Sequence, residues 1–269
     1  MQQSASPFDF RAGSYVEQYQ SLLVPRLFAP WARRLLDCVE FHAGDTLLDV
    51  ACGPGTVTRE AAQRGGKGVT GVDSSSAMLD IARVLDERAT VVYLEGMAGA
   101  LPVSDAAYTV VTCQQGLQFF ADRAAAFAEM RRALVDRGRI AIAVWAQLDR
   151  QPFWSAVIRG LERGASPEIA EGLHKPFSFP GASQLRDEMI DAGFAHISVF
   201  TDELPIVFEG GLMQAGQTAY ATPSGNELQR FDAATRQRLL EATIEELRPF
   251  ESNGIVESTC SAHIAVARR

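Results

Sequence analysis

Residues 47–56 read LLDVACGPGT, and residues 71–73 read GVD. In the first stretch an apolar strand runs into a turn of small residues. In the second, a strand ends on a carboxylate about 20 residues after that turn, which is the spacing by which an open α/β sheet holds an adenosine-containing cofactor. These two stretches therefore predict a cofactor-binding α/β domain.

Strands and helices alternate outward from this stretch. Five apolar runs read as strands, over residues 46–51, 68–73, 90–95, 107–114 and 139–145. Repeated β-α-β units with short links predict a parallel, doubly wound sheet with right-handed crossovers. Two later runs, over residues 195–204 and 255–267, add strands, so we expect a Rossmann-like α/β fold with a seven-stranded sheet whose last strand is antiparallel.

The remaining segments read mostly as helices. Residues 14–40 have an apolar helical face that Pro25 and Pro30 interrupt. The alternation changes after about residue 150, where a helix and a loop rich in Pro, Phe and Gly begin a helical lid insertion. We expect four segments: an N-terminal helical cap (1–40), a cofactor-binding core (41–149), a lid insertion and helix (150–194), and C-terminal strands with a helical insertion (195–269).

The composition excludes several classes of protein. The 269 residues are 47% hydrophobic, enough for one large core, and they contain no membrane-spanning run of about 18 apolar residues. A net charge of −8 without a basic stripe argues against binding to nucleic acid. The four cysteines are far apart, so we expect neither a metal site nor a disulfide framework. The polar N-terminal residues carry no signal pattern, and we expect a cytoplasmic location.

The two stretches at the opening supply the candidate cofactor residues. Asp49 lies inside an apolar strand, where a carboxylate needs hydrogen-bond donors, and it either organises the next loop or is solvated at the strand end. Gly53 and Gly55 leave the backbone bare for close approach of a ligand. Asp73 can accept both hydroxyls of a ribose. Met78 either packs on an adenine ring or belongs to the core.

The glycine pattern discriminates between two cofactors. The dinucleotide fingerprint G-x-G-x-x-G needs glycines at positions 51, 53 and 56, where this chain has Ala51, Gly53 and Thr56. Asp49 lies close to where the phosphates of a dinucleotide would be. Its negative charge suits a cationic amino-acid and sulfonium ligand better.

These motifs resemble those of the class I S-adenosylmethionine-dependent methyltransferases, in the small-molecule subgroup that includes the ubiquinone- and menaquinone-biosynthesis-type enzymes. The resemblance covers roughly residues 10–146. The segments that carry it are 47–56, 71–79, 95–103, 111–120 and 133–139.

The resemblance implies S-adenosylmethionine as cofactor and S-adenosylhomocysteine as product. Met97 stands where the family usually has an aspartate that accepts from the adenine amino group, so that hydrogen bond is absent, whereas Ala98 still offers its backbone N–H. Two tyrosines of the first helix either contact the cofactor or pack on the core. The implied cofactor residues are Tyr15, Tyr19, Asp49, Ala51, Gly53, Gly55, Asp73, Ser74, Met78, Met97, Ala98 and Gln114.

The resemblance also implies that Gln115, Gln118 and Phe119 line the entrance for the methyl acceptor. Trp154 and Phe177 of the lid insertion either build an apolar acceptor pocket or form the lid's own core. We expect a small, hydrophobic, aromatic or lipid-like acceptor. A general base is needed only for a tightly held proton, and His174 is the candidate. Apolar residues of the first helix and the insertion permit a homodimer.

We therefore expect an enzyme that transfers a methyl group to an O, N or C atom of a small molecule by in-line displacement. Three alternatives stay open. A nicotinamide-dependent oxidoreductase would need a catalytic pattern such as Y-x-x-x-K, which the sequence lacks. A non-catalytic cofactor-binding protein fits Met97 and the lack of an evident base. A nucleic-acid or protein methyltransferase is disfavoured, in its nucleic-acid form, by the acidic charge and by the lack of an Asn-Pro-Pro-Tyr-type motif.

Overall fold

The computed structural model describes residues 18–222 and 224–269. They form two compact units. One, which we call the helical unit, contains the described residues up to Phe28, with Gln147–Ser178 and Glu203–Ser261. The other, the sheet unit, contains Ala29–Ala146, Phe179–Asp202 and Ala262–Arg269. Each unit is therefore assembled from segments that are far apart in the sequence.

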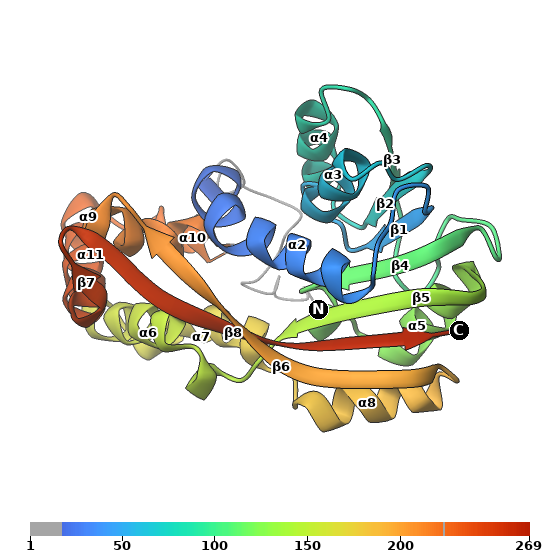
Figure 1. Cartoon of the computed structure of the whole chain (residues 1–269). Helices are drawn as coiled ribbons and strands as arrows, with labels where there is room; N and C mark the ends of the chain where they lie inside the picture. Colours follow the sequence, from blue (N-terminus) through green and yellow to red (C-terminus); the bar gives the residue numbers. More distant parts are fainter. Residues whose placement is uncertain (1–17, 223) are drawn as a thin grey trace, which may run out of the picture. The chain divides into compact units, whose positions relative to one another are not determined.

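The sheet has the strand order β3-β2-β1-β4-β5-β8-β6 (Figure 1). Strands β1 to β5 pair in parallel along this order, and β8 is antiparallel to β5. The strands β6 and β8 continue from the sheet unit into the helical unit. Their bounds are β1 Leu47–Val50, β2 Val69–Asp73, β3 Val91–Glu95, β4 Tyr108–Gln114, β5 Leu134–Trp145, β6 Ala195–Phe208 and β8 Ile255–Arg268.

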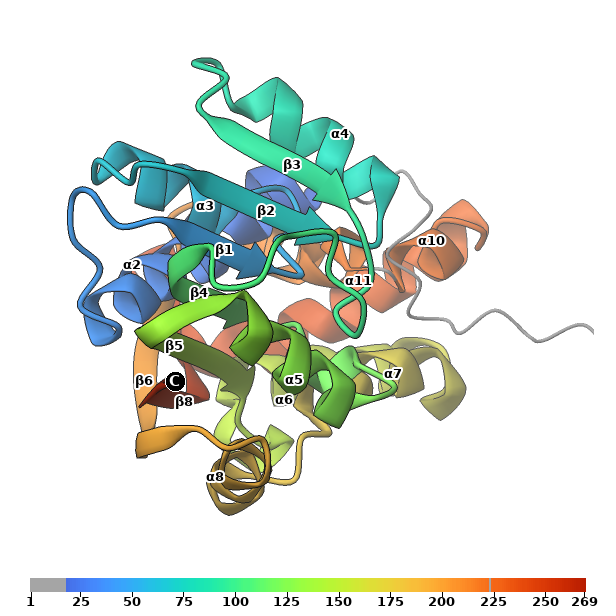
Figure 2. The ribbon, with the colours of Figure 1, turned by 90° about the vertical axis from the view of Figure 1, so that its right-hand side faces the viewer.

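Helices cover both faces of this sheet, because alternate residues of its buried strands point to opposite sides. Leu48, Val111 and Ile142 belong to a core cluster that also holds residues of α5 and α8, while α2 contacts β4 and β5 and packs against α3 (Figure 2). The helices of the sheet unit are α2 Ala29–Cys38, α3 Thr56–Gln63, α4 Ser76–Leu85, η2 Leu117–Phe119, α5 Arg123–Ala133 and α8 Ala182–Asp191.

Two of these helices begin at side-chain caps. The Ser75 hydroxyl accepts a hydrogen bond from the backbone N–H of Met78, and the Asp122 carboxylate accepts one from Ala125. Each cap satisfies a backbone donor that the first helical turn leaves unpaired. The helix α4 therefore begins directly after the strand β2, which fixes the loop that follows Asp73.

The helical unit is built mainly from short helices. Gly160 of α6 lies against the backbone of Thr243 in α11, so the two helices pack closely. A two-residue strand, β7 Glu251–Ser252, pairs with the start of β8. The helices are η1 Tyr19–Phe28, η3 Leu148–Arg150, α6 Pro152–Gly164, α7 Pro167–His174, η4 Lys175–Phe177, α9 Gly211–Gly216, η5 Gln217–Ala221, α10 Gly225–Leu228, α11 Ala233–Leu247 and η6 Arg248–Phe250.

The Rossmann-like fold and the seven strands predicted from sequence are confirmed, and β8 is antiparallel to β5 as expected of the last strand. Three details differ. The strand β5 begins at Leu134 and β6 ends at Phe208, beyond the predicted bounds, and β7 was not predicted. The first helical segment consists of a π-helix that contains Pro25, followed by α2. Within the described residues, no helix is both long and apolar enough to cross a membrane.

Candidate functional site

The loops that follow β1 and β2 meet at the carboxyl end of the sheet. Oδ2 of Asp73 accepts a hydrogen bond of 2.8 Å from the backbone N–H of Gly53. Oδ1 of the same carboxylate accepts one of 2.8 Å from the backbone N–H of Ser75. The Asp73 side chain therefore ties the two predicted cofactor loops together, and each carboxylate oxygen retains a further lone pair for a ligand.

The loop after β1 depends on residues with positive φ. Ala51, Gly53 and Gly55 have φ values of 58°, 53° and 78°. A Cβ atom on Gly55 would lie 2.5 Å from the Tyr93 hydroxyl oxygen, so only glycine fits there. A Cβ atom on Gly53 would meet no atom within 4 Å. Gly53 therefore borders open space, as the approach of a ligand requires.

Asp49 is the buried carboxylate of this site. It is 1% exposed, and its Oδ1 accepts a hydrogen bond of 2.8 Å from the Thr112 hydroxyl group. Burial raises the pKa of Asp49 to about 7, and the negative charge of Asp73 adds to the shift. Burial also raises the pKa of Asp73, while backbone hydrogen bonds act in the opposite direction. Asp73, together with an Asp49 that is about half ionised at neutral pH, makes this end of the sheet electronegative.

Sequence reasoning missed Thr112 and Tyr93. Thr112 lies directly beside Asp49 in the parallel pairing of β1 with β4. Tyr93 exchanges a hydrogen bond of 3.0 Å with Thr58 beneath the loop. Only the strand register relates Thr112 to Asp49, since the two are 63 positions apart in the chain. No motif in the sequence carries that information.

The other predicted cofactor residues occupy different environments. Ser74 is exposed directly after Asp73, and Met78 is buried in α4. Met97 is 58% exposed, in a turn that bridges to Ala100. Ala98 is half-buried against the main core cluster.

The two tyrosines predicted for the first helix have different outcomes. Tyr19 lies in the helical unit, where its ring stacks on Phe28 at a centroid distance of 4.8 Å. Tyr15 lies outside the described residues. Neither observation tests a contact with the cofactor, so both stay predictions.

The loop after β4 packs against the loop after β1. A Cβ atom on Gly116 would lie 2.6 Å from the Cβ atom of Ala51, so the two loops touch at these positions. Gln114 is half-buried at the end of β4, and Gln115 follows it with a φ of 56°. The side chain of Phe119 is half-buried in η2.

Gln115 and Gln118 carry buried amide groups that lack hydrogen-bond partners among the described residues. Their side chains are 6% and 8% exposed, respectively. The amide nitrogen and the amide oxygen of each side chain form no hydrogen bond. An unpaired buried polar group costs about 1–3 kcal/mol, so four such atoms in one loop indicate groups that a ligand or ordered water molecules satisfy.

The remaining predicted residues belong to the helical unit. Trp154 and Phe177 are buried, with ring centroids 6.0 Å apart, and Phe153 lies beside Trp154. His174 is exposed at the end of α7, where its Nε2 atom lies 3.9 Å from a carboxylate oxygen of Glu162. The structure therefore brings together the residues of the β1, β2 and β4 loops in the sheet unit and, separately, the two aromatic residues in the helical unit.

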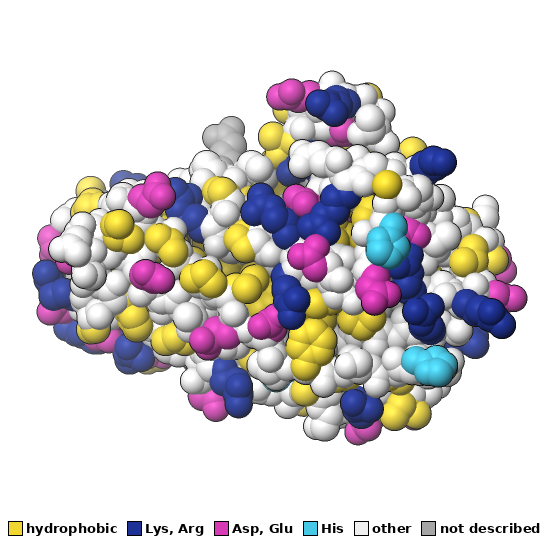
Figure 3. All heavy atoms as spheres, viewed as in Figure 1, with side chains coloured by type: hydrophobic (Ala, Val, Ile, Leu, Met, Phe, Trp, Pro, Cys, Tyr) yellow, Lys and Arg dark blue, Asp and Glu magenta, His cyan; other side chains and the backbone are white. Residues whose placement is uncertain are grey.

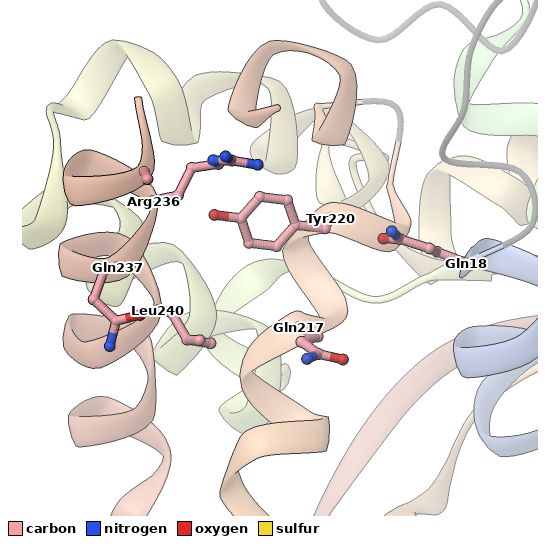
Figure 4. Close-up of a pocket in the computed structure, with 7 residues that line it drawn as sticks. Gln18, Gln217, Tyr220, Arg236, Gln237 and Leu240 are labelled. Atoms are coloured by element: carbon pink, nitrogen blue, oxygen red, sulfur yellow. The ribbon is translucent and has the colours of Figure 1, made fainter. Parts of the chain in front are cut away.

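The surface adds two observations. Acidic and basic side chains are interspersed on the face of the molecule viewed in Figure 3. A pocket within the helical unit is lined by Gln18, which precedes η1, and by residues of η5 and α11, and none of its described lining residues is a predicted site residue (Figure 4). In residues 18–222 and 224–269, no group of three or more His, Cys, Asp or Glu side chains is arranged to hold a metal ion.

Comparison with known proteins gives one family. Residues 48–142 match the methyltransferase domain family. The demethylmenaquinone methyltransferase of Thermus thermophilus is 31% identical over 182 residues, which cover 61% of this chain and 81% of the relative. The 2-phytyl-1,4-naphtoquinone methyltransferase of Thermosynechococcus vestitus is 37% identical over 115 residues, so the match spans 42% of this chain and about half (51%) of that relative.

Solved structures share the fold at low sequence identity. Phosphoethanolamine N-methyltransferase 2 of Haemonchus contortus, solved in complex with S-adenosyl-L-methionine, superposes with a TM-score of 0.57 and 15% identity. The match covers 96% of this chain and 60% of that chain. The likeness shows that the two chains share a fold.

Proposed function

The chain belongs to the methyltransferase family, and we propose that it transfers the methyl group of S-adenosylmethionine to an O, N or C atom of a small hydrophobic or aromatic molecule. The observation that carries this proposal is the tie between the Asp73 carboxylate and the backbone N–H groups of Gly53 and Ser75. It joins the two loops that hold the adenosine part of a cofactor in α/β sheets.

The residues present fit this cofactor. The free lone pairs of Asp73 suit ribose hydroxyl groups, and the open space at Gly53 suits a ligand that contacts bare backbone. The Asp49 carboxylate supplies negative charge beside a cationic amino-acid group. When bound, S-adenosylmethionine supplies a methyl group that its sulfonium charge has already activated. The other residues of the proposed cofactor set are Ala51, Gly55, Ser74, Met78, Met97, Ala98, Gln114, Tyr15 and Tyr19.

The acceptor side of the proposal rests on the loop after β4. The amides of Gln115 and Gln118 would hydrogen-bond a polar edge of the acceptor, and Phe119 would contact its apolar part. Trp154 and Phe177 are the proposed apolar contacts from the helical unit. One relative is named for a 1,4-naphthoquinone and another for demethylmenaquinone, which supports a quinone-like aromatic acceptor. The chain's own task in transfer is to align the nucleophile and to exclude water.

The experiment is a methyl-transfer assay with methyl-labelled S-adenosylmethionine. A naphthoquinol and a simple phenol serve as probe acceptors, and label in the extracted organic product is counted. We expect transfer to at least one aromatic acceptor and none after Asp73→Ala. Transfer to neither acceptor by a protein that binds the cofactor would exclude aromatic acceptors of this kind.

His174 is the proposed general base for an acceptor hydroxyl group. Replacing it with Asn should lower kcat for the phenol by about 10²–10⁴-fold and leave cofactor binding unchanged. Replacing the exposed His42, which lies in the sheet unit, is the control. An unchanged rate for His174→Asn would remove this residue from the mechanism.

Homodimerisation, the absence of nucleic-acid binding and a cytoplasmic location are further parts of the proposal, and they rest on sequence alone. The net charge of −8 supports the absence of nucleic-acid binding. Light scattering after gel filtration measures the oligomeric state. A filter-binding assay with duplex DNA and RNA tests nucleic-acid binding, and cell fractionation tests the location.

A further inference from the structure

The pocket in the helical unit lies between η5 and α11 and has a volume of about 410 Å³ (Figure 4). Its volume falls in the range of small-molecule sites, roughly 300–1,000 Å³. Its described lining residues all belong to one unit, and none of them is part of the proposed methyl-transfer site. The lining residues are Gln18, Gln217, Tyr220, Ala233, Arg236, Gln237 and Leu240.

The spacing of these residues along their helices places their side chains along one groove. Positions 233, 236, 237 and 240 share one face of α11, and positions 217 and 220 share one face of η5. Close packing supports the groove at its base, since a Cβ atom on Gly216 would lie 2.9 Å from Leu240. A Cβ atom on Gly225 would lie 2.2 Å from the backbone oxygen of Tyr220, so this contact holds the backbone of Tyr220 in place.

Arg236 brings a positive charge that is not neutralised locally. Among the described residues it forms no ion pair, whereas Arg248 pairs with Glu245 on the same stretch of chain. The acidic groups nearest in sequence have other partners: the Asp232 carboxylate accepts from the backbone N–H of Thr235, and Glu241 accepts from Gln237. The guanidinium group therefore retains its donors for a ligand.

Tyr220 places a neutral hydroxyl group beside that charge. Figure 4 shows Arg236 extending from α11 toward Tyr220, whose hydroxyl group points toward α11. Burial raises the pKa of Tyr220, and the positive charge of Arg236 acts in the opposite direction. The phenol is thus protonated at neutral pH. Its O–H makes no hydrogen bond to any described residue, which leaves it as a second donor.

We propose that this pocket binds a small organic anion, in which a carboxylate or a phosphate monoester is attached to an aromatic or aliphatic body. The anion takes the planar fork of Arg236 and the hydroxyl group of Tyr220, because a guanidinium pairs well with such oxygens. The body lies against Leu240 and the Tyr220 ring. The amides of Gln217 and Gln18 bind neutral polar substituents.

The test is a nuclear magnetic resonance titration of the full-length, isotope-labelled protein with benzoate, phenyl phosphate and benzamide. Benzamide is the neutral counterpart of benzoate and has nearly the same shape. We expect saturable shifts at Arg236 Nε–H and at residues 217–220 with at least one anion, and at least tenfold weaker binding of benzamide. The stronger anion identifies the headgroup.

Matched variants complete the test. Arg236→Gln should weaken binding of the anion at least tenfold, and Tyr220→Phe should weaken it severalfold. Arg238→Gln is the control, because Arg238 lies on the same helix but donates to Thr235 and does not line the pocket. Amide spectra that match the parent protein verify folding. Equal binding of benzamide, no saturable response to either anion, or equal losses in Arg236→Gln and Arg238→Gln would overturn the proposal.

Discussion

Asp49 couples the cofactor site to the stability of the fold. Its pKa is about 7 in the folded chain and about 3.9 in an unfolded one, so the folded state binds more protons between these values. The free energy of unfolding therefore falls as the pH rises through this window and levels off above it. Asp49→Asn removes the titration and keeps an oxygen for the Thr112 hydroxyl group. The free energy of unfolding of Asp49→Asn, minus that of the parent protein, should therefore rise by about 2–3 kcal/mol from pH 5 to pH 8.

Urea denaturation of both proteins at the two pH values measures this difference without added cofactor. Asp122→Asn, at an exposed helix cap, is the control and should show no comparable change. An advantage of Asp49→Asn that is equal at pH 5 and pH 8 would contradict the assignment of a shifted pKa to Asp49.

Gln118 and Gln151 are both buried glutamines, and they should respond oppositely to replacement by Leu. Both amide atoms of Gln118 lack partners within residues 18–222 and 224–269, whereas those of Gln151 pair with the backbone of Ser261. Gln118→Leu should therefore raise the free energy of unfolding by about 1–3 kcal/mol and abolish methyl transfer without loss of cofactor affinity. Gln151→Leu should lower the free energy of unfolding by a similar amount, since Ser261 loses its partners.

Thermal denaturation and a cofactor titration of the two variants give the comparison. A destabilised Gln118→Leu would mean that the amide has a structural partner in solution. It would thereby remove the argument that a ligand satisfies it.

At the residue scale, the sequence predicts the groups whose role is local. Asp73 is the last residue of β2 and Gly53 lies just after β1, and their hydrogen bond joins the two predicted loops. Thr112 could not be predicted, because its relation to Asp49 depends on which strands are neighbours and in what register. The unpaired amides of Gln118 are equally invisible in sequence, since pairing depends on the packing of the whole loop.

At the scale of elements, the packing of α6 on α11 depends on one glycine. A Cβ atom on Gly160 would lie 2.4 Å from the Cα atom of Thr243, and backbone atoms of a helix cannot move aside easily. Gly160→Ala should therefore lower the free energy of unfolding by about 2 kcal/mol, although alanine favours a helix over glycine by about 1 kcal/mol. Urea denaturation measures the change, with Glu162→Ala at the surface of the same helix as control. A stabilised Gly160→Ala would contradict this close helix contact.

Elements with a strong hydrophobic period could be predicted, and those set by tertiary pairing could not. The strands β1 to β4 lie within the predicted runs. The two-residue strand β7 exists only because β8 passes beside it. Pro25 lies inside η1, where the wider π-helix turn takes the place of the break expected at this residue.

At the scale of the whole molecule, the fold depends on strands that return from distant parts of the sequence. The sheet unit gains β6 only after the chain has passed through Gln147–Ser178 of the helical unit, and it gains the end of β8 only after Glu203–Ser261. Periodicity identifies these strands, but it does not reveal that β8 lies between β5 and β6. Strand order is a property of the complete chain. For that reason the sequence predicts how many strands there are better than it predicts which strands are neighbours.

The central claim is that the loops joined by Asp73 bind S-adenosylmethionine, and calorimetric titration of the full chain tests it most directly. We predict micromolar binding of S-adenosylmethionine and S-adenosylhomocysteine, no binding of NAD, and loss of both affinities by at least about 100-fold in Asp73→Ala, which removes a charged hydrogen-bond acceptor. Binding of NAD alone, or binding of S-adenosylmethionine that Asp73→Ala leaves unchanged, would contradict the account.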